Sequence, residues 1–100
     1  MKYNKLVRDK IPDIIKQNGD SAVIHRADEK EYIEKLRDKL QEETDEFFKK
    51  PSLEEMADIL EVLDAVNKVF NIDVDKLQII KKQKKEKRGG FEQRIILDES

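Results

Sequence analysis

Two long stretches of helical periodicity, separated by a short break, constrain the fold of this chain most strongly. Apolar residues recur at helical spacing from Asp28 to Phe48, and the stretch from Leu53 to Phe70 is unusually rich in apolar residues. The break between them reads "KKPS", and its Ser52 is well placed to cap the second helix. Because this connection is short, we predict that the two helices form an antiparallel hairpin.

The flanking segments predict shorter elements. Residues 7–20 should hold a short helix, with Pro12 in its first turn and Gly19 just beyond its end. A third long helix is expected from about Val74 to Lys87, capped by Asp73 or Asp75 and stopped by Gly89-Gly90. The segments "SAVIH" (21–25) and "FEQRIIL" (91–97) are typical of short strands, and the second is suited to pair with an N-terminal segment. The prediction is an all-α fold, an antiparallel bundle of about four helices with short extended terminal segments, in one domain spanning residues 1–100.

The charge content limits the core and the partners. Charged residues make up 44% of the chain against 37% hydrophobic residues, so the core should be thin and a homodimer or homotetramer is expected to complete it. The net charge of -2 argues against a nucleic-acid binder, although Lys81–Arg88 is strongly basic. No apolar run reaches membrane-spanning length, and the N-terminus does not read as a signal peptide, which predicts no membrane association and a cytoplasmic location.

Two acidic residues of the first long helix lie where solubility does not explain them. A helix turns by about 100° per residue, so positions around its axis follow from the sequence. The apolar side chains within about 60° of Glu43 are Leu36, Leu40 and Phe47. Glu43 is therefore in the middle of the apolar stripe, and Glu46 is at the edge of that stripe. Glu42 is expected to face solvent.

The second long helix carries a matching pair. Glu55 and Asp58 are three residues apart, the same spacing as Glu43 and Glu46. Around the helix axis Asp58 is enclosed by apolar residues, whereas Glu54 and Glu61 fall on a solvated side. The apolar neighbours of Asp58 are Val62, Ala65 and Val69.

Four carboxylates on facing helices predict a metal site. Burying one unpaired carboxylate costs several kcal/mol, so such a group persists only if cations neutralise it. The chain has no cysteine, and neither helix has a histidine, so the oxygen-only donors favour Mg²⁺, with Mn²⁺ as a substitute. Because Mg²⁺ keeps positions open for water and phosphate oxygens, a phosphorylated substrate is expected.

Simpler explanations exist for each pair. Ser52-x-x-Glu55 matches a capping box, in which the Glu55 side chain reaches back to the Ser52 backbone N–H. Lys35 and Lys39 precede Glu43 and Glu46 at helical spacing, so surface ion pairs would also account for these glutamates.

The carboxylate pattern, Glu42-Glu43-x-x-Glu46 followed by Glu55-x-x-Asp58, resembles the signature of the all-α nucleoside triphosphate pyrophosphohydrolases. The segments "YNKLVRDKIPDII" (3–15), "RGGF" (88–91) and "RIIL" (94–97) are similar to its small MazG-like, house-cleaning branch. The resemblance implies a helical fold in which Glu43, Glu46, Glu55 and Asp58 hold Mg²⁺. It also implies hydrolysis between the α- and β-phosphates of a nucleotide, and assembly into dimers or tetramers.

Catalytic and substrate-binding residues follow from this chemistry. Glu43 and Glu46 are the candidate catalytic residues, and Glu46 is preferred for orienting or deprotonating the attacking water. Lys84 and Arg88 are four residues apart and share a helix face, which suits them to bind phosphate oxygens. The full set of candidate substrate-binding residues is Arg8, Lys10, Lys84, Arg88 and Phe91.

Two other functions fit the same sequence. Within the same class, the chain would act as a phosphoribosyl-ATP pyrophosphohydrolase. In a different class, it would be a non-catalytic helical interaction module whose acidic pairs are caps and ion pairs and whose basic helix binds a partner.

Overall fold

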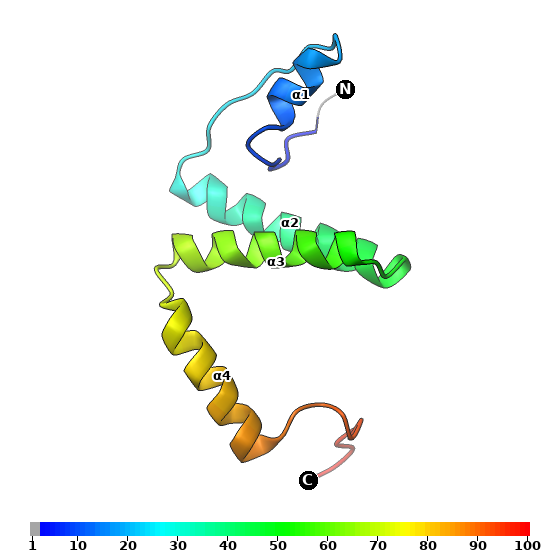
Figure 1. The fold of residues 1–100 in the computed structure, drawn as a ribbon, viewed down its shortest axis with the longest axis vertical. Helices are drawn as coiled ribbons and strands as arrows, with labels where there is room; N and C mark the ends of the chain where they lie inside the picture. The colour runs from blue at the N-terminus through cyan, green and yellow to red at the C-terminus, as the bar shows by residue number, and fades with distance from the viewer. Residues whose placement is uncertain (1–2) are drawn as a thin grey trace. The chain divides into compact units, whose positions relative to one another are not determined.

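The computed structural model describes residues 3–100, and these residues form helices, turns and irregular segments but no strand (Figure 1). They divide into two compact units, one ending at Phe70 and one beginning at Asn71. The first unit contains α1, α2 and α3, and the second contains α4. The all-α prediction is confirmed. The helices are α1 (Ile11–Gln17), α2 (Glu29–Lys49), α3 (Leu53–Val69) and α4 (Val74–Arg88).

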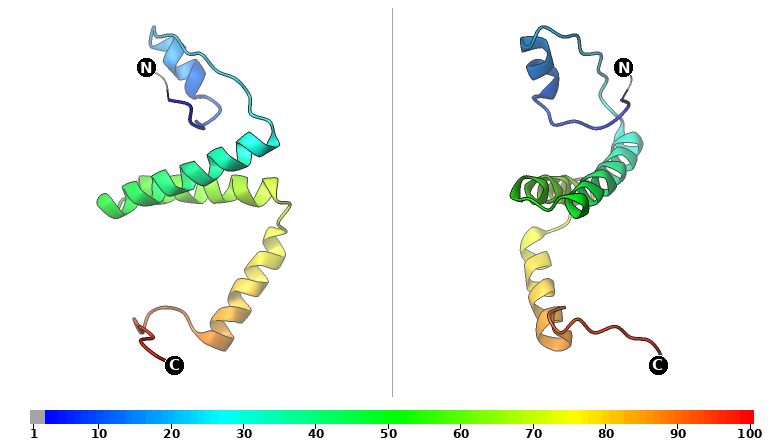
Figure 2. Two further views of the ribbon diagram at one scale, coloured as in Figure 1. Left: turned by 180° about the vertical axis from the view of Figure 1, so that it is seen from behind. Right: turned by 90° about the vertical axis from the view of Figure 1, so that its right-hand side faces the viewer.

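Helices α2 and α3 form the predicted hairpin. They lie side by side and run in opposite directions, as Figure 1 and the left view of Figure 2 show, and they make the principal helix-to-helix contact of the first unit. Helix α3 begins at the predicted Leu53, and α2 begins one residue after the predicted Asp28. In both, the side chain before the helix supplies an acceptor for the first N–H groups. Asp28 Oδ1 accepts from the Glu31 N–H at 2.9 Å, and Ser52 Oγ accepts from the Glu55 N–H at 3.1 Å.

The hairpin has a small apolar core. Leu36 of α2 is 2% exposed and Val62 of α3 is 8% exposed, and these are the buried hydrophobic residues among residues 3–100. Toward the N-terminal half of α2 the two helices also frame an apolar hollow, whose lining includes Leu40, Val66 and Phe70. The thin core expected from the composition is therefore present in the first unit.

The flanking helices also follow the sequence signals. Pro12 lies in the first turn of α1, and Gly19, two residues beyond its end, adopts a left-handed φ of +86°. In the second unit, Asp73 caps α4 by accepting from the N–H groups of Asp75 and Lys76, and Gly89 ends it at φ +82°. The four helices are too short or too polar for any of them to span a membrane, within the described part of the chain.

Both strand predictions are wrong. Residues 21–25 are irregular, and the Val23 side chain is fully exposed. The segment 91–97 begins with a turn, and Arg94 within it has a left-handed φ of +57°, which ends any extended run. Apolar residues favour a strand only when a neighbouring strand accepts their backbone hydrogen bonds, and neither segment has such a neighbour in residues 3–100.

Candidate metal centre

Three of the four predicted ligands meet on the hairpin. Glu43 projects from α2 and Glu55 and Asp58 from α3, and one carboxylate oxygen of each lies within 4.8 Å of the others. The antiparallel packing brings the C-terminal half of α2 beside the first turns of α3, which is why residues on either side of the break come together. A group of three carboxylates at this separation can bind a metal ion.

Glu43 is the most buried member of this group. It is 6% exposed, and its Oε1 forms an ion pair with Lys39 Nζ at 3.2 Å. Its other oxygen, Oε2, is buried without a hydrogen-bond partner, and so is Oε2 of Glu55. Buried carboxylate oxygens nearly always have partners in folded proteins. A cation between the two helices would supply one for both.

Glu55 has two roles in the structure. Its backbone N–H is held by Ser52, so the predicted cap is confirmed, but the return bond from the Ser52 N–H to the Glu55 carboxylate does not form among the described residues. The carboxyl group lies near Glu43 instead. The neighbouring Glu43 carboxylate would accept a hydrogen bond from a protonated Glu55, and this favours the protonated form. Together with desolvation and repulsion from Glu46, Glu43 and Asp58, it raises the pKa of Glu55 from 4.5 to about 7.

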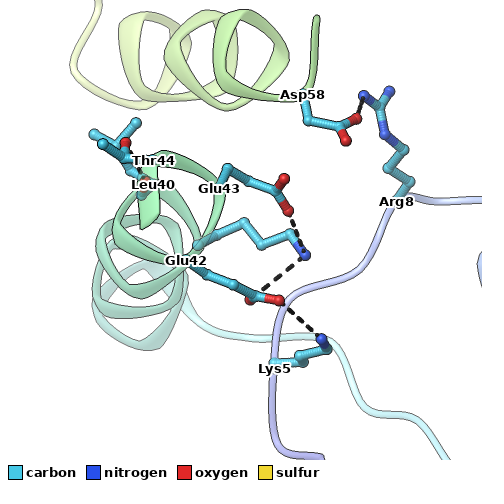
Figure 3. A network of polar contacts seen from close by, with 8 residues as sticks. Lys5, Arg8, Leu40, Glu42, Glu43, Thr44 and Asp58 are labelled. Carbon is cyan, nitrogen blue, oxygen red and sulfur yellow. Dashed lines mark hydrogen bonds and ion pairs between the residues drawn. The ribbon is translucent and has the colours of Figure 1, made fainter. Parts of the chain in front are cut away.

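Cationic side chains surround the carboxylates. Arg8 Nη2 donates to Asp58 Oδ1 at 2.7 Å (Figure 3). Its Nη1 lies 3.6 Å from Glu61 Oε1. Lys5 Nζ donates to Glu42 Oε1 at 3.1 Å, and this bond lowers the pKa of Glu42. Both cations come from the irregular segment before α1, which passes beside the acidic end of the hairpin. These pairs offset part of the negative charge.

The fourth predicted ligand lies apart. Glu46 is exposed and is not a member of the three-carboxylate group, although its charge still reaches Glu55. It lines a surface hollow at the turn between α2 and α3. The other residues lining that hollow are Lys49, Lys50, Ser52, Glu54 and Glu55.

The predicted substrate-binding residues are distributed over both units. Arg8 is at the carboxylates, as described, and Lys10 is exposed at the start of α1. Lys84 and Arg88 lie four residues apart on α4, so they share a face of that helix, and Phe91 is exposed in the turn that follows.

Two lysines matter more than the sequence suggested. Lys39, expected to make a surface ion pair, is only 20% exposed in its side chain and contacts both Glu42 and Glu43. Its position four residues before Glu43 was a usable signal. Lys5 was missed, and with it the half-buried position of Glu42, because their contact joins residues 37 positions apart.

Comparison with known proteins adds no identification. No family model, no curated protein and no solved structure matches this chain.

Proposed function

We propose that this chain is a Mg²⁺-dependent nucleotide pyrophosphohydrolase that converts a nucleoside or deoxynucleoside triphosphate into the monophosphate and pyrophosphate. One observation carries the proposal: Glu43, Glu55 and Asp58 converge on the hairpin with two buried carboxylate oxygens that have no partner. An acidic group that served only as surface charge would leave its oxygens in water. The reaction class rests on the resemblance of the motifs in residues 3–15, 42–58 and 88–97.

The donor chemistry fits Mg²⁺. All three side chains offer carboxylate oxygens, which are the ligands that hard divalent cations prefer. Three protein ligands leave coordination positions free for water and phosphate, and Mn²⁺ suits the same donors. When bound, such an ion supplies charge neutralisation for a triphosphate and lowers the pKa of water.

Glu46 is the proposed proton acceptor. It is exposed beside Glu55 rather than inside the carboxylate group, so its oxygens are free of the contacts that occupy Glu43. A carboxylate at this position can orient or deprotonate an attacking water. Glu43 would act by holding the metal. Lys10, Lys84, Arg88 and Phe91 stay candidates for binding the nucleotide.

A homo-oligomer is part of the proposal. Leu53, Met56, Leu60 and Leu63 of α3 are exposed and recur at intervals of three and four residues. This spacing places them in one stripe, away from the face that carries Val62. With so small a core in the first unit, covering this stripe with a second copy would add apolar burial. Sedimentation of the chain and of Leu60→Glu tests this point, since the variant should be monomeric.

The decisive experiment is a panel of nucleotides assayed for pyrophosphate release with Mg²⁺ and with a chelator. Metal-dependent release from a nucleoside triphosphate is the expected result. Release from phosphoribosyl-ATP alone would favour the narrower activity in the same class. No release from any nucleotide, together with no change in melting temperature on adding Mg²⁺ or Mn²⁺, would leave a non-catalytic interaction module as the better account.

A further inference from the structure

Arg8 forms an ion pair with Asp58, one of the candidate metal ligands. Its guanidinium donates to Asp58 Oδ1 at 2.7 Å across 50 positions of sequence, a short charge-assisted contact. Asp58 is also one of the three carboxylates whose oxygens lie within 4.8 Å of one another. A guanidinium and a divalent cation on the same carboxylate repel each other, so the ion pair competes with metal binding.

The two basic side chains that neutralise the carboxylate group are held in different ways. Lys39 lies on the same helix as Glu43, only 20% of its side chain is exposed, and it contacts two carboxylates. The Arg8 side chain is 53% exposed and extends from an irregular segment. The Arg8 backbone is anchored, because its carbonyl accepts from the Ile11 N–H at 3.0 Å. The exposed Arg8 guanidinium therefore has room to turn without moving the chain, whereas Lys39 is more enclosed and has two carboxylate partners.

We propose that Arg8 is an exchangeable counter-ion, which pairs with Asp58 in the metal-free protein and turns to the phosphoryl oxygens of the bound substrate when a cation takes its place. This inference rests on the proposed function. The guanidinium suits both partners, because its planar fork binds carboxylate and phosphate with two parallel N–H groups. In the metal-free state it limits repulsion among the acidic groups. In the loaded state the same charge lies beside the metal, where the phosphates must bind.

The exchange predicts opposite effects on two binding steps. Arg8→Gln removes the competitor, so Mn²⁺ titrated alone by calorimetry should bind about 2- to 5-fold more tightly than to the unchanged chain. At saturating Mn²⁺, inorganic tripolyphosphate should bind about 10-fold or more weakly to the variant, because a charged donor to phosphate is lost. Arg8→Lys, which keeps the charge without the fork, should restore the metal affinity of the unchanged chain and recover the anion affinity only in part.

Lys16→Gln is the matched control, since Lys16 is an exposed cation in the last turn of α1 and has no proposed role at the site. It should leave Mn²⁺ affinity unchanged. Equal Mn²⁺ affinity in Arg8→Gln and the unchanged chain, or weaker binding in Arg8→Gln, would overturn the exchange and make Arg8 a structural support for Asp58. In those cases the unchanged chain still binds metal and the proposed function stands. If the unchanged chain binds no Mn²⁺, both ideas are overturned.

Discussion

The two ends of the α2–α3 hairpin are built from the same helices and the same packing, yet they differ in chemistry. At one end Leu36 and Val62 are buried, and Leu36 lines the apolar hollow between the helices. At the other, Glu43 occupies an equally buried position, two helical turns from Leu36, and faces Glu55 and Asp58. Apolar burial stabilises the hairpin, whereas burial of unpaired carboxylate oxygens opposes it. The apolar end therefore holds the acidic end in a geometry that it would not adopt alone.

Removing charge from the acidic end tests most directly whether the two ends of the hairpin have different roles. Glu43→Gln or Asp58→Asn should reduce metal-dependent turnover by at least about 100-fold, because each removes a proposed ligand. Without metal the variants should melt at the same temperature as the unchanged chain or higher, since repulsion between carboxylates is relieved. Pyrophosphate release and melting curves measure the two effects.

Matched substitutions on the same helices serve as controls for those variants. Glu34→Gln on α2 and Asp64→Asn on α3 change exposed acids of the same type. Both should keep turnover within about 2-fold of the unchanged chain, an effect below about 0.5 kcal/mol. Equal losses in both sets would show that position on the helix does not distinguish these acids.

Leu36→Ala tests the role of the apolar end. Leu36 is 2% exposed, so its truncation should lower the free energy of unfolding by about 3 kcal/mol through lost burial and a cavity. Urea denaturation measures the change, and Leu36→Val gives a smaller step if the alanine variant does not fold. Leu97→Ala, the same substitution at an exposed position, should change stability by less than about 0.5 kcal/mol. A small effect at Leu36 would contradict the division of roles.

The N-cap of α3 connects the two ends. Ser52→Ala removes the acceptor for the Glu55 N–H and should lower the free energy of unfolding by about 1 kcal/mol. Since Glu55 is in the first turn of α3, metal affinity should also weaken. Ser52→Thr keeps the hydroxyl and should restore both quantities. Loss of stability with unaltered metal affinity would mean that the cap does not position Glu55.

The smallest expected effect is the dependence of metal-free stability on pH. The pKa of Glu55 is about 7 in the folded chain and 4.5 ordinarily, so the folded chain binds this proton more tightly. The contribution of the Glu55 proton to stability is complete below about pH 4.5 and is lost as pH rises through 7. Melting temperatures in a chelator should therefore fall more between pH 5 and pH 8 for the unchanged chain than for Glu55→Gln. The melting temperature of Glu54→Gln, which changes an exposed neighbour, should fall by the same amount as that of the unchanged chain.

Local sequence signals predicted much of this structure, but they did not predict contacts between residues far apart in the sequence. The caps at Ser52 and Asp73 act within three residues, so the sequence places them well. The interior position of Glu43 follows from helical period alone. The contact of Arg8 with Asp58 spans 50 positions and leaves no periodic trace, and the two predicted strands failed because strand formation depends on a partner elsewhere in the chain.

The central claim is that the acidic end of the hairpin is a cation site rather than a patch of surface charge. The most direct measurement is a calorimetric titration of the unchanged chain and of Glu43→Gln with Mn²⁺ and Mg²⁺ in the absence of nucleotide. Saturable binding by the unchanged chain, lost or weakened at least about 10-fold in Glu43→Gln, is the predicted result. Absence of saturable binding, or identical binding by both proteins, would contradict the account.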